Sequence, residues 1–309
     1  MPETLPNDGL LPHFTRHTVP TGDVAINLAT AGTGPPVLML HGYPQTHVMW
    51  HRIAPRLAEK YTVVLTDMRG QDGSAKPPGG PTHREYAKRT LARDNYLVMA
   101  ELGFERFAVV GHDRGARVAH RMALDYADSV AALAVLDVLP NRYTLRHIDY
   151  LVAQKYFHWF FLGVEDPLPE RLIAAMPEQW VRSAMTFAAG PDSRGLDEAA
   201  IREYIRCFAD PAAIHAGCED FRAGSRADLM DDDADHALGK RVTCPVLALW
   251  GRDGYGGFYG DAVLDAWREY ATDVRGHEMP CGHWVPEQAA PEVIAELTDF
   301  LDEPMSAHT

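Results

Sequence analysis

The sequence predicts an α/β protein: a mostly parallel, doubly wound sheet with an inserted helical cap. Three observations lead to this prediction. Short apolar runs alternate with stretches of helical period, which is typical of a parallel sheet with helices on both faces. Most of the runs are continuously apolar, as expected for strands that are covered on both sides. One long stretch, between residues 140 and 239, contains no convincing central strand.

The predicted core elements follow one another in a regular order. Strands are predicted at residues 24–29, 36–41, 62–66, 107–111, 131–136 and 246–250. Helices are predicted at residues 46–59, 84–102, 115–126 and 291–301. Thr46 is the predicted N-cap of the first helix, because its hydroxyl can accept a backbone hydrogen bond. Strands that alternate with helices in this way favour a doubly wound sheet.

The long stretch without a strand predicts the domain organisation. It contains aromatic-rich text of helical period, IDYLVAQKYFHWFFL and LDEAAIREYIRCF. We therefore expect a core formed by residues 1–139 and 241–309, and a helical cap formed by residues 140–240. Ligands of open α/β sheets bind at the carboxyl ends of the strands, so a cap that leaves from that edge would form a lid over the site.

Composition and charge exclude several classes of function. Lys and Arg number 29 against 43 Asp and Glu, and the net charge of −14 disfavours nucleic acid and anionic membranes as partners. No apolar run approaches the ~20 residues that span a bilayer, and the first residues, MPETLPNDGLLPHF, lack a basic leader. We therefore expect a cytoplasmic protein. Cys207, Cys218, Cys244 and Cys281 form no CxxC pair, so we expect free thiols.

The strongest chemical signal is Gly111-His112-Asp113-Arg114-Gly115. It follows the apolar run RFAVV and precedes the helical stretch ARVAHRMALDY. A strand, a G-x-nucleophile-x-G turn and a helix form the context of a nucleophile elbow, in which the central side chain stands exposed above the sheet. Here the central residue is Asp113. A carboxylate at that position can attack carbon and form a covalent ester.

Such an ester must be cleaved by water, which requires a base and an acid that orients it. His283, in Pro280-Cys281-Gly282-His283-Trp284, follows the last expected strand and precedes the final helix, as the histidine of a nucleophile–acid–histidine order does. Two carboxylates can orient it. Asp137 ends the run AALAVLD, and Asp253 follows the next core strand. The residues alone leave both open.

Two arginines follow the nucleophile on the first turn of the same predicted helix. Cations at a helix N-terminus oppose the macrodipole, so Arg114 and Arg117 indicate a clamp for an anion, and paired guanidiniums suit a carboxylate. The loop His41-Gly42-Tyr43-Pro44 ends another core strand. The backbone N–H groups of Tyr43 and Arg114 are the predicted oxyanion donors, because Pro44 has none.

These motifs resemble the fluoroacetate (haloacetate) dehalogenases, which are α/β-hydrolases with a helical cap. The resemblance rests on HGYPQTHVMWHRIAP, GHDRGARVAHRMALD, AVLDVLP and YFHWFFL, and it extends from about residue 13 to residue 301. It implies a soluble enzyme that acts on a small anionic 2-haloacid with water and without a metal or organic cofactor. Homodimers are common among such relatives, so a homodimer is also expected by analogy.

The resemblance implies a role for each matching residue. Asp113 would displace the halide by SN2 attack, Arg114 and Arg117 would hold the substrate carboxylate, and His283 would activate water. The VLD motif points to Asp137 rather than Asp253. The pair His158 and Trp159 would donate hydrogen bonds to the leaving halide, although without the resemblance the same pair would be placed in the core of the cap.

Two departures from the family pattern affect the expected substrate. The family's third halide donor is a Tyr in a sequence like C-x-D-Y-R-A-G, and here that position is Phe221. One lost hydrogen bond to a developing anion costs ~1.5–3 kcal/mol, or roughly 10–150-fold in rate, and fluoride should suffer more than chloride or bromide. A cap Trp that narrows the family's pocket is not evident either, and Phe187 is expected in its place.

Other functions are less consistent with the residues. Epoxide hydrolases share the Asp nucleophile but need cap tyrosines, one of which is replaced by Phe221, and they need no arginine clamp. Haloalkane dehalogenases usually carry Trp where Arg114 stands. An esterase would need Ser or Cys at position 113. From another class, a binding protein on an idle hydrolase fold is disfavoured because Asp113, Asp137 and His283 are all present.

Overall fold

The computed structural model describes residues 9–192 and 194–306, so most of the segment on which the prediction of no leader rests lies outside the described residues. One eight-stranded sheet forms the centre, with the order β1-β2-β4-β3-β5-β6-β7-β8. The strands are β1 (Thr15–Pro20), β2 (Ala25–Ala31), β3 (Pro36–Leu40), β4 (Thr62–Thr66), β5 (Phe107–His112), β6 (Val130–Leu136), β7 (Val246–Gly251) and β8 (Val274–Met279). β1, β2 and β4 pair antiparallel, and all other pairs are parallel.

The predicted fold class is confirmed. The six predicted strands correspond to β2 through β7, and all residues of β5, β6 and β7 are buried. The predicted strands include none at β1, and the last expected strand, β8, is predicted without bounds. Both are edge strands with polar sequences, TRHTVP and VRGHEM, and both expose part of their residues to solvent. An edge strand needs no continuous apolar run, so the signal that located the central strands is absent there.

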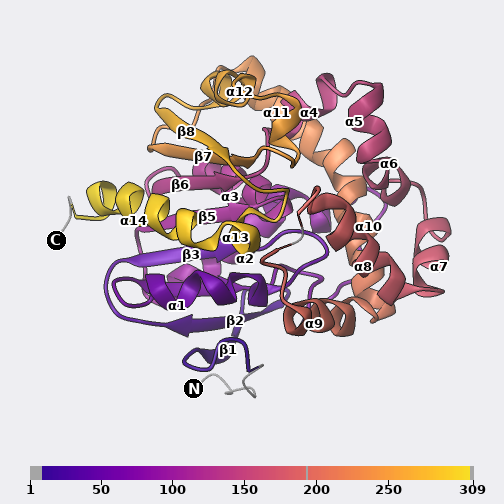
Figure 1. Cartoon of the computed structure of the whole chain (residues 1–309), viewed down its shortest axis with the longest axis horizontal. Coiled ribbons are helices and arrows are strands. Elements are labelled where there is room, and N and C mark those ends of the chain that lie inside the picture. The colour runs from indigo at the N-terminus through magenta and orange to yellow at the C-terminus, as the bar shows by residue number, and fades with distance from the viewer. Residues whose placement is uncertain (1–8, 193, 307–309) are drawn as a thin grey trace.

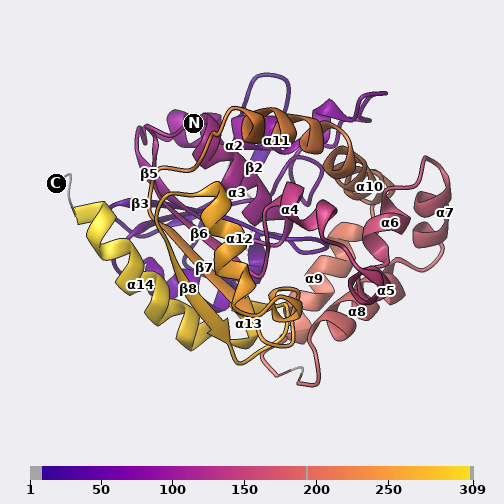
Figure 2. The same cartoon turned by 90° about the horizontal axis from the view of Figure 1, so that it is seen from above.

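Helices cover both faces of the sheet (Figures 1 and 2). On one face, α1 (Ala54–Leu57), α13 (Val285–Gln288) and α14 (Ala290–Ser306) pack in one apolar cluster with the strands. On the other face lie α2 (Lys88–Glu101), α3 (Arg114–Asp125) and α12 (Ala262–Tyr270). The short 3₁₀ helices η1 (His47–Arg52), η2 (Arg84–Tyr86) and η3 (Gly256–Phe258) complete the core. This is the doubly wound arrangement that buries both faces of parallel strands.

One predicted helix differs in form. Residues 46–59 form η1 and α1 rather than one continuous helix, and the Thr46 side chain makes no capping hydrogen bond. Pro55 lies in the first turn of α1, where the proline's missing N–H is tolerated, whereas a continuous helix would need that donor. Thr46 lies at the predicted N-cap position, that of η1, but its hydroxyl does not accept the predicted hydrogen bond.

A long helical segment separates β6 from β7, and we call residues 141–237 the helical segment. It contains α4 (Asn141–Arg146), α5 (Tyr150–Lys155), α6 (His158–Leu162), α7 (Leu168–Ala174), α8 (Pro177–Ala188), α9 (Glu198–Phe208), α10 (Pro211–Ser225) and α11 (Ala227–Ala237). Figure 1 places α5 to α10 at one end of the sheet. At that end, Trp180 of α8 donates a 2.8 Å hydrogen bond to the hydroxyl of Tyr43, which follows β3. The segment therefore meets the core at the carboxyl ends of the strands, where α/β sheets bind ligands.

Two further observations concern the cysteines and the possibility of a membrane span. Cys207, Cys218, Cys244 and Cys281 are free cysteines. Within residues 9–192 and 194–306, no helix combines the length and the apolar character needed to cross a membrane.

Candidate active site

The turn after β5 holds the backbone of Asp113 in a conformation that residues other than glycine rarely adopt. Its φ is 50° and its ψ is −117°, a combination that costs free energy and is tolerated where the surroundings enforce it. The flanking glycines are required by close approach. A Cβ on Gly111 would lie 2.5 Å from the Cα of Ala116, and one on Gly115 would lie 2.4 Å from the carbonyl oxygen of His41. The sequence motif therefore forms a sharp turn, with Asp113 at the N-terminus of α3.

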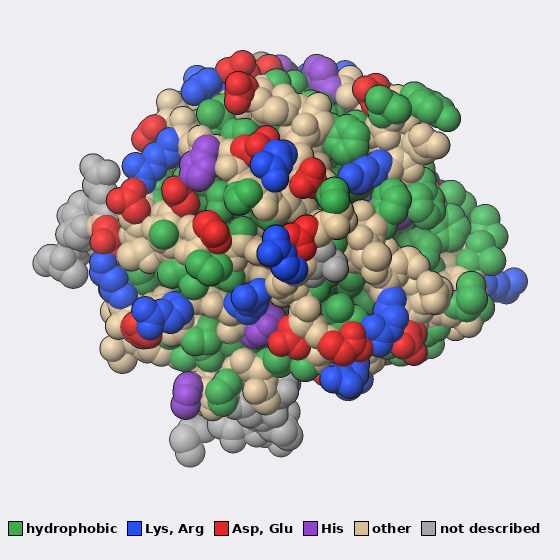
Figure 3. Space-filling view, in the orientation of Figure 1, with side chains coloured by type: hydrophobic (Ala, Val, Ile, Leu, Met, Phe, Trp, Pro, Cys, Tyr) green, Lys and Arg blue, Asp and Glu red, His purple; other side chains and the backbone are tan. Residues whose placement is uncertain are grey.

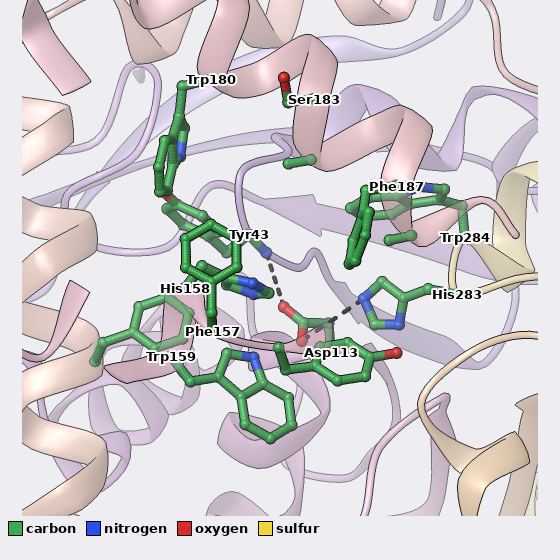
Figure 4. A pocket seen from close by; sticks show the side chains of 14 residues that line it. Tyr43, Asp113, Phe157, His158, Trp159, Trp180, Ser183, Phe187, His283 and Trp284 are labelled. Atoms are coloured by element: carbon green, nitrogen blue, oxygen red, sulfur yellow. Dashed lines mark hydrogen bonds and ion pairs between the residues drawn. The ribbon is translucent and has the colours of Figure 1, made fainter. Parts of the chain in front are cut away.

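The Asp113 carboxylate lies between the loop after β3 and a histidine ring (Figure 4). One oxygen, Oδ1, accepts a hydrogen bond from the backbone N–H of Tyr43 at 3.0 Å. The other, Oδ2, lies 3.8 Å from Nε2 of His283. Burial opposes ionisation, but His283, His112 and the Tyr43 N–H outweigh it and lower the pKa of Asp113 to about 2. The carboxylate is therefore ionised at neutral pH.

His283 is held by Asp137. Its Nδ1 donates to Oδ2 of Asp137 at 2.6 Å, which leaves Nε2 unprotonated and facing Asp113. The Asp137 carboxylate also accepts backbone N–H groups from Gly251, Tyr255 and Gly256, at 3.0, 2.8 and 3.0 Å. Burial disfavours the His283 cation, but the hydrogen bond and the charge of Asp137 prevail and raise the pKa of His283 above its usual range.

The second carboxylate that the sequence left open lies elsewhere. Asp253 lines a separate surface cavity with Lys155, Arg252 and Phe258. Its backbone oxygen accepts a hydrogen bond from Nζ of Lys155 at 3.3 Å. Of the two carboxylates, Asp137 is therefore the one that contacts the His283 ring.

His112 lies beneath the site and was not singled out from the sequence. Its Nε2–H donates to the backbone oxygen of His283 at 2.8 Å, and the two ring centroids are 4.7 Å apart. Burial, followed by the charge of His283, lowers the pKa of His112 to about 4. The ring is neutral at neutral pH, so it supports the His283 backbone without adding a second cation next to Asp113.

The two arginines differ in their partners. The Arg114 Nε donates to the Asp220 carboxylate, one of its terminal nitrogens donates to the Asp220 backbone oxygen at 2.7 Å, and its Cζ lies 4.3 Å from the Phe221 ring centroid. Arg117 donates to Oδ1 of Asn141 at 2.8 Å and pairs with no carboxylate within the described parts of the chain. Burial, followed by the neighbouring charge of Arg114, lowers the pKa of Arg117. Arg117 is thus a buried cation that forms no ion pair within the described residues, and the Asp113 and Asp220 carboxylates act on it only at longer range.

A cavity of about 170 Å³ opens above Asp113, and its lining is largely aromatic (Figure 4). The polar groups in the lining include the carboxylate of Asp113 and the rings of His158 and His283. The aromatic side chains are Tyr43, Tyr156, Phe157, Trp159, Trp180, Phe187, Phe221 and Trp284, and the small ones are Ser183, Ala184 and Ala188. Arg114 and Arg117 do not belong to this lining; they lie behind Phe221 and Trp159.

The predicted halide pair reaches the cavity. His158 begins α6, and burial lowers its pKa to about 4, so it can offer a neutral N–H but not a cation at neutral pH. Trp159 lies beside it in the lining. Phe221 of α10 packs edge-on against Tyr43 with centroids 5.3 Å apart and presents carbon where the family pattern has a hydroxyl. Phe187 also lines the cavity, but 54% of it is exposed, so it forms part of the mouth.

Sequence reasoning missed Tyr156, which also lines the cavity. Its hydroxyl oxygen is buried and has no hydrogen-bond partner within the described parts of the chain. Its ring packs on Trp159 with centroids 4.8 Å apart, and burial raises the pKa of the phenol well above its usual value. No motif marks such a residue, because the missing partner becomes visible only in three dimensions. A buried unpaired hydroxyl is costly, so its position in the cavity suggests a bound partner.

Among the described residues, three side-chain clusters outside this cavity have the composition of a metal site, and the most buried of them is formed by His47, Asp67 and Asp72. Ligand atoms of His47, Asp67 and Asp72 lie within 4.8 Å of one another. Two cations already compensate it, because Asp72 accepts hydrogen bonds from Arg16 at 2.9 Å and from Arg206 at 2.8 Å. His47 also hydrogen-bonds Asp67 at 2.9 Å. We therefore assign no metal to this cluster.

The fold and the site place the chain in a family. It matches the family model described as alpha/beta hydrolase fold over residues 35–289, and the chain belongs to that family. A fluoroacetate dehalogenase from Burkholderia sp is 41% identical over 95% of both chains. A soluble epoxide hydrolase from Corynebacterium sp. (strain C12) is 34% identical over 93% of this chain and 97% of the relative.

A solved structure extends the likeness to three dimensions. A protein from Nostoc sp PCC 7120, described provisionally as an alpha/beta hydrolase, is 49% identical, with a TM-score of 0.91 over 94% of this chain and 99% of that one. Together with the curated relatives, this likeness supports a hydrolase activity. The resemblance stated from the sequence motifs is thereby confirmed at the level of the family, while dehalogenase and epoxide hydrolase relatives are both near.

Proposed function

We propose that the chain is a hydrolytic dehalogenase that cleaves the carbon–halogen bond of a 2-haloacid of the haloacetate type. One juxtaposition carries the proposal: an ionised Asp113 faces His283, while Arg117 lies nearby as a buried cation that forms no ion pair within the described residues. A buried unpaired charge is costly, and the carboxylate of a 2-haloacid would compensate it. An epoxide or a haloalkane would not.

The first step forms a covalent ester. A carboxylate oxygen of Asp113 attacks the carbon that carries the halogen, the carbon–halogen bond breaks, and the halide leaves with the electron pair toward the N–H groups of His158 and Trp159. Arg117, together with the part of Arg114 that Asp220 does not occupy, holds the substrate carboxylate. Because Tyr43 and His283 hold the Asp113 carboxylate from two sides, little reorganisation is needed for the attack.

The second step regenerates the enzyme. His283 Nε2 takes a proton from water, and the water oxygen attacks the ester carbon that belongs to Asp113. The N–H groups of Tyr43 and Arg114 stabilise the oxyanion. The bond from that carbon to the substrate oxygen then breaks, and the product leaves as a 2-hydroxyacid after taking the proton from His283. Asp113 is left as a carboxylic acid and releases the second proton of the water, which restores its carboxylate. The balance is 2-haloacid plus water to 2-hydroxyacid, halide and a proton. Asp137 orients His283 and stabilises its cation throughout.

The helical segment would act as the cap in this reaction. It supplies His158, Trp159 and Phe221 to the cavity, whereas the core supplies Asp113 and His283. Closure of the segment over the strand ends would exclude bulk water from the developing charge. We propose the boundaries that the sequence predicts, with residues 140–240 as the cap and residues 1–139 and 241–309 as the core.

Halide release tests the proposed function directly. Fluoro-, chloro- and bromoacetate are supplied to the wild type and to Asp113→Ala, and free halide is measured. We expect release by the wild type alone. The matched control is Asp128→Ala, an exposed aspartate outside the site, which should keep full activity. No halide from any of the three acids and from larger 2-haloacids would overturn the assignment.

A second candidate function is epoxide hydrolysis, and Tyr156 is the observation that favours it. The sequence analysis disfavoured this function because Phe221 replaces one cap tyrosine. The buried, unpaired hydroxyl of Tyr156 could supply the proton that an opening epoxide oxygen needs. Hydrolysis of styrene oxide by the wild type, with its loss in Tyr156→Phe, would favour this candidate. The uncompensated Arg117 favours the dehalogenase.

A further inference from the structure

We propose that the preferred substrate carries an apolar, ring-sized substituent on the carbon that Asp113 attacks, and that one face of α8 binds this substituent. The inference rests on the proposed function. In that function the attacked carbon carries a carboxylate and a halogen, and the inference says where a third substituent on the same carbon would bind. The evidence for it is the set of α8 side chains in the cavity lining and the hydrogen bonds of Trp180 and Trp284. These residues have no part in the proposed reaction steps.

The groups that bind the carboxylate and the halide lie together on one side of the cavity. The Arg117 Cζ lies 5.5 Å from the Trp159 ring centroid, and the Arg114 Cζ lies 4.3 Å from that of Phe221. The His158 and Phe221 centroids are 6.1 Å apart. Figure 4 shows His158 and Trp159 on one side of Asp113, and Phe187 and Trp284 on the other. The second side is therefore free for another part of the substrate.

One face of α8 forms the wall opposite Asp113 and reaches from Trp180, on the side of His158, to Phe187 on the second side (Figure 4). The residues of α8 that line the cavity are Trp180, Ser183, Ala184, Phe187 and Ala188. Their spacing is that of a single helical face. The side chains between the two large rings are small, so the helix leaves space opposite Asp113 where a larger residue would fill it. The cavity of about 170 Å³ exceeds the ~150 Å³ of an apolar cavity that binds benzene.

The two tryptophans of this space present carbon rather than hydrogen-bond donors. The indole N–H of Trp284 donates to the backbone oxygen of Met185 at 2.7 Å. The indole N–H of Trp180 donates to the hydroxyl of Tyr43 at 2.8 Å. Both donors are used within the protein, so the two rings offer only apolar surface to a ligand. A two-carbon acid would leave this apolar surface in contact with water. An aromatic substituent would cover it, and the burial of apolar surface would strengthen binding.

Binding of unreactive acids tests the inference without turnover. Acetate and phenylacetate are titrated into the wild-type protein by calorimetry. We expect phenylacetate to bind at least tenfold more tightly than acetate, and the advantage to fall below threefold in Ala184→Trp, where an indole fills the space between Trp180 and Phe187. Thr186→Trp is the matched control, because Thr186 is exposed on the same helix and lies outside the cavity lining. Equal binding of the two acids to the wild type would overturn the inference.

Turnover separates failure of this inference from failure of the proposed function. Halide release is measured from chloroacetate and from 2-chloro-2-phenylacetate. A higher kcat/KM for the aryl acid than for chloroacetate, with a ratio of the two that falls at least tenfold in Ala184→Trp, supports the inference. Release from chloroacetate without release from the aryl acid overturns the inference and leaves the proposed function standing. Release from neither acid overturns the proposed function, and the inference with it.

Discussion

At the scale of single residues, the site depends on a few buried titratable groups. Their pKa values are shifted so that the carboxylate is ionised and two of the three histidines are neutral at neutral pH. The pKa of Asp113 falls to about 2, so the proposed nucleophile is ionised, and the pKa of His283 rises because Asp137 contacts its ring. His112 and His158 are neutral at neutral pH because burial lowers the pKa of each to about 4. The site therefore contains one histidine that can become a cation near neutral pH, and that one faces the nucleophile.

Replacement of Asp137 should change both the rate and the pH profile. In the wild type, His283 must be neutral to accept a proton from water, so kcat should rise with pH and reach half its maximum above pH 6.5, the ordinary pKa of histidine. Asp137→Asn removes the charge that raises the pKa, and burial then lowers it. We expect kcat to fall by about 10³-fold and the midpoint to move to lower pH. Halide release followed from pH 5 to pH 9 measures both, and an unchanged midpoint would contradict this role of Asp137.

Adding a hydroxyl at position 221 should raise the rate of fluoride release more than the rate of bromide release. Phe221→Tyr adds a donor on the side of the cavity that holds His158. We expect the rate with fluoroacetate to rise by roughly 10–150-fold and the rate with bromoacetate to rise much less, because bromide leaves with less need for hydrogen bonds. Phe187→Tyr, at the mouth of the cavity, is the control. Equal gains for both halides would argue against a halide contact at this position.

At the scale of elements, one buried carboxyl joins the helical segment to the core. Glu287 of α13 accepts a hydrogen bond from the hydroxyl of Tyr204 in α9 at 3.1 Å and lies 2.5 Å from the side-chain amide of Gln45, in the loop that carries Tyr43. Burial raises the pKa of Glu287 to about 8. The carboxyl is therefore mostly protonated at neutral pH, and it connects three elements that surround the site.

The buried Glu287 carboxyl makes the stability of the protein depend on pH. The folded-state pKa of about 8 exceeds the ordinary value of 4.5, so the contribution of Glu287 is fully present below pH 4.5 and is lost as the pH rises through about 8. Between pH 6 and pH 8, we expect the wild type to lose roughly 2 kcal/mol more unfolding free energy than Glu287→Gln, which cannot titrate. Urea unfolding at the two pH values measures the difference. Parallel losses in the two proteins would show that Glu287 does not titrate in this range.

At the scale of the whole molecule, exposed apolar side chains gather on the helical segment. Figure 3 shows a broad apolar area over the end of the molecule that carries α6 to α8. Leu168, Leu172 and Met176, in and just after α7, are 52%, 54% and 62% exposed. Extended exposed apolar patches often mark interaction sites. We propose that a second copy of the chain covers this face and forms the homodimer that the resemblance leads us to expect.

Light scattering with size-exclusion chromatography measures the mass in solution. We expect twice the chain mass for the wild type and a shift toward one chain mass for Leu172→Asp, because a buried unpaired carboxylate would destabilise the interface. Leu238→Asp is the control, because Leu238 is 82% exposed and lies at the end of α11, away from the patch. A monomeric wild type would exclude this dimer.

Local patterns in the sequence were sufficient for six of the eight strands, for the elbow and for the position of His283. Continuous apolar runs locate strands that are buried on both faces, and the glycines around Asp113 mark a turn in which any Cβ would collide. The sequence by itself thus determined the order of the central strands along the chain and the residues at the ends of β5 and β6. It also determined the helical character of residues 141–237, because their period is local information.

Only the tertiary structure decided which of these residues meet. Asp137 and Asp253 both follow core strands, and the contact of Asp137 with His283 joins residues that are 146 positions apart. The pairing of Arg114 with Asp220, the isolation of Arg117 and the unpaired hydroxyl of Tyr156 are likewise long-range facts. The physical reason is that a side chain's partner, burial and pKa depend on the elements packed around it, whereas sequence periodicity records only which face of its own element it occupies.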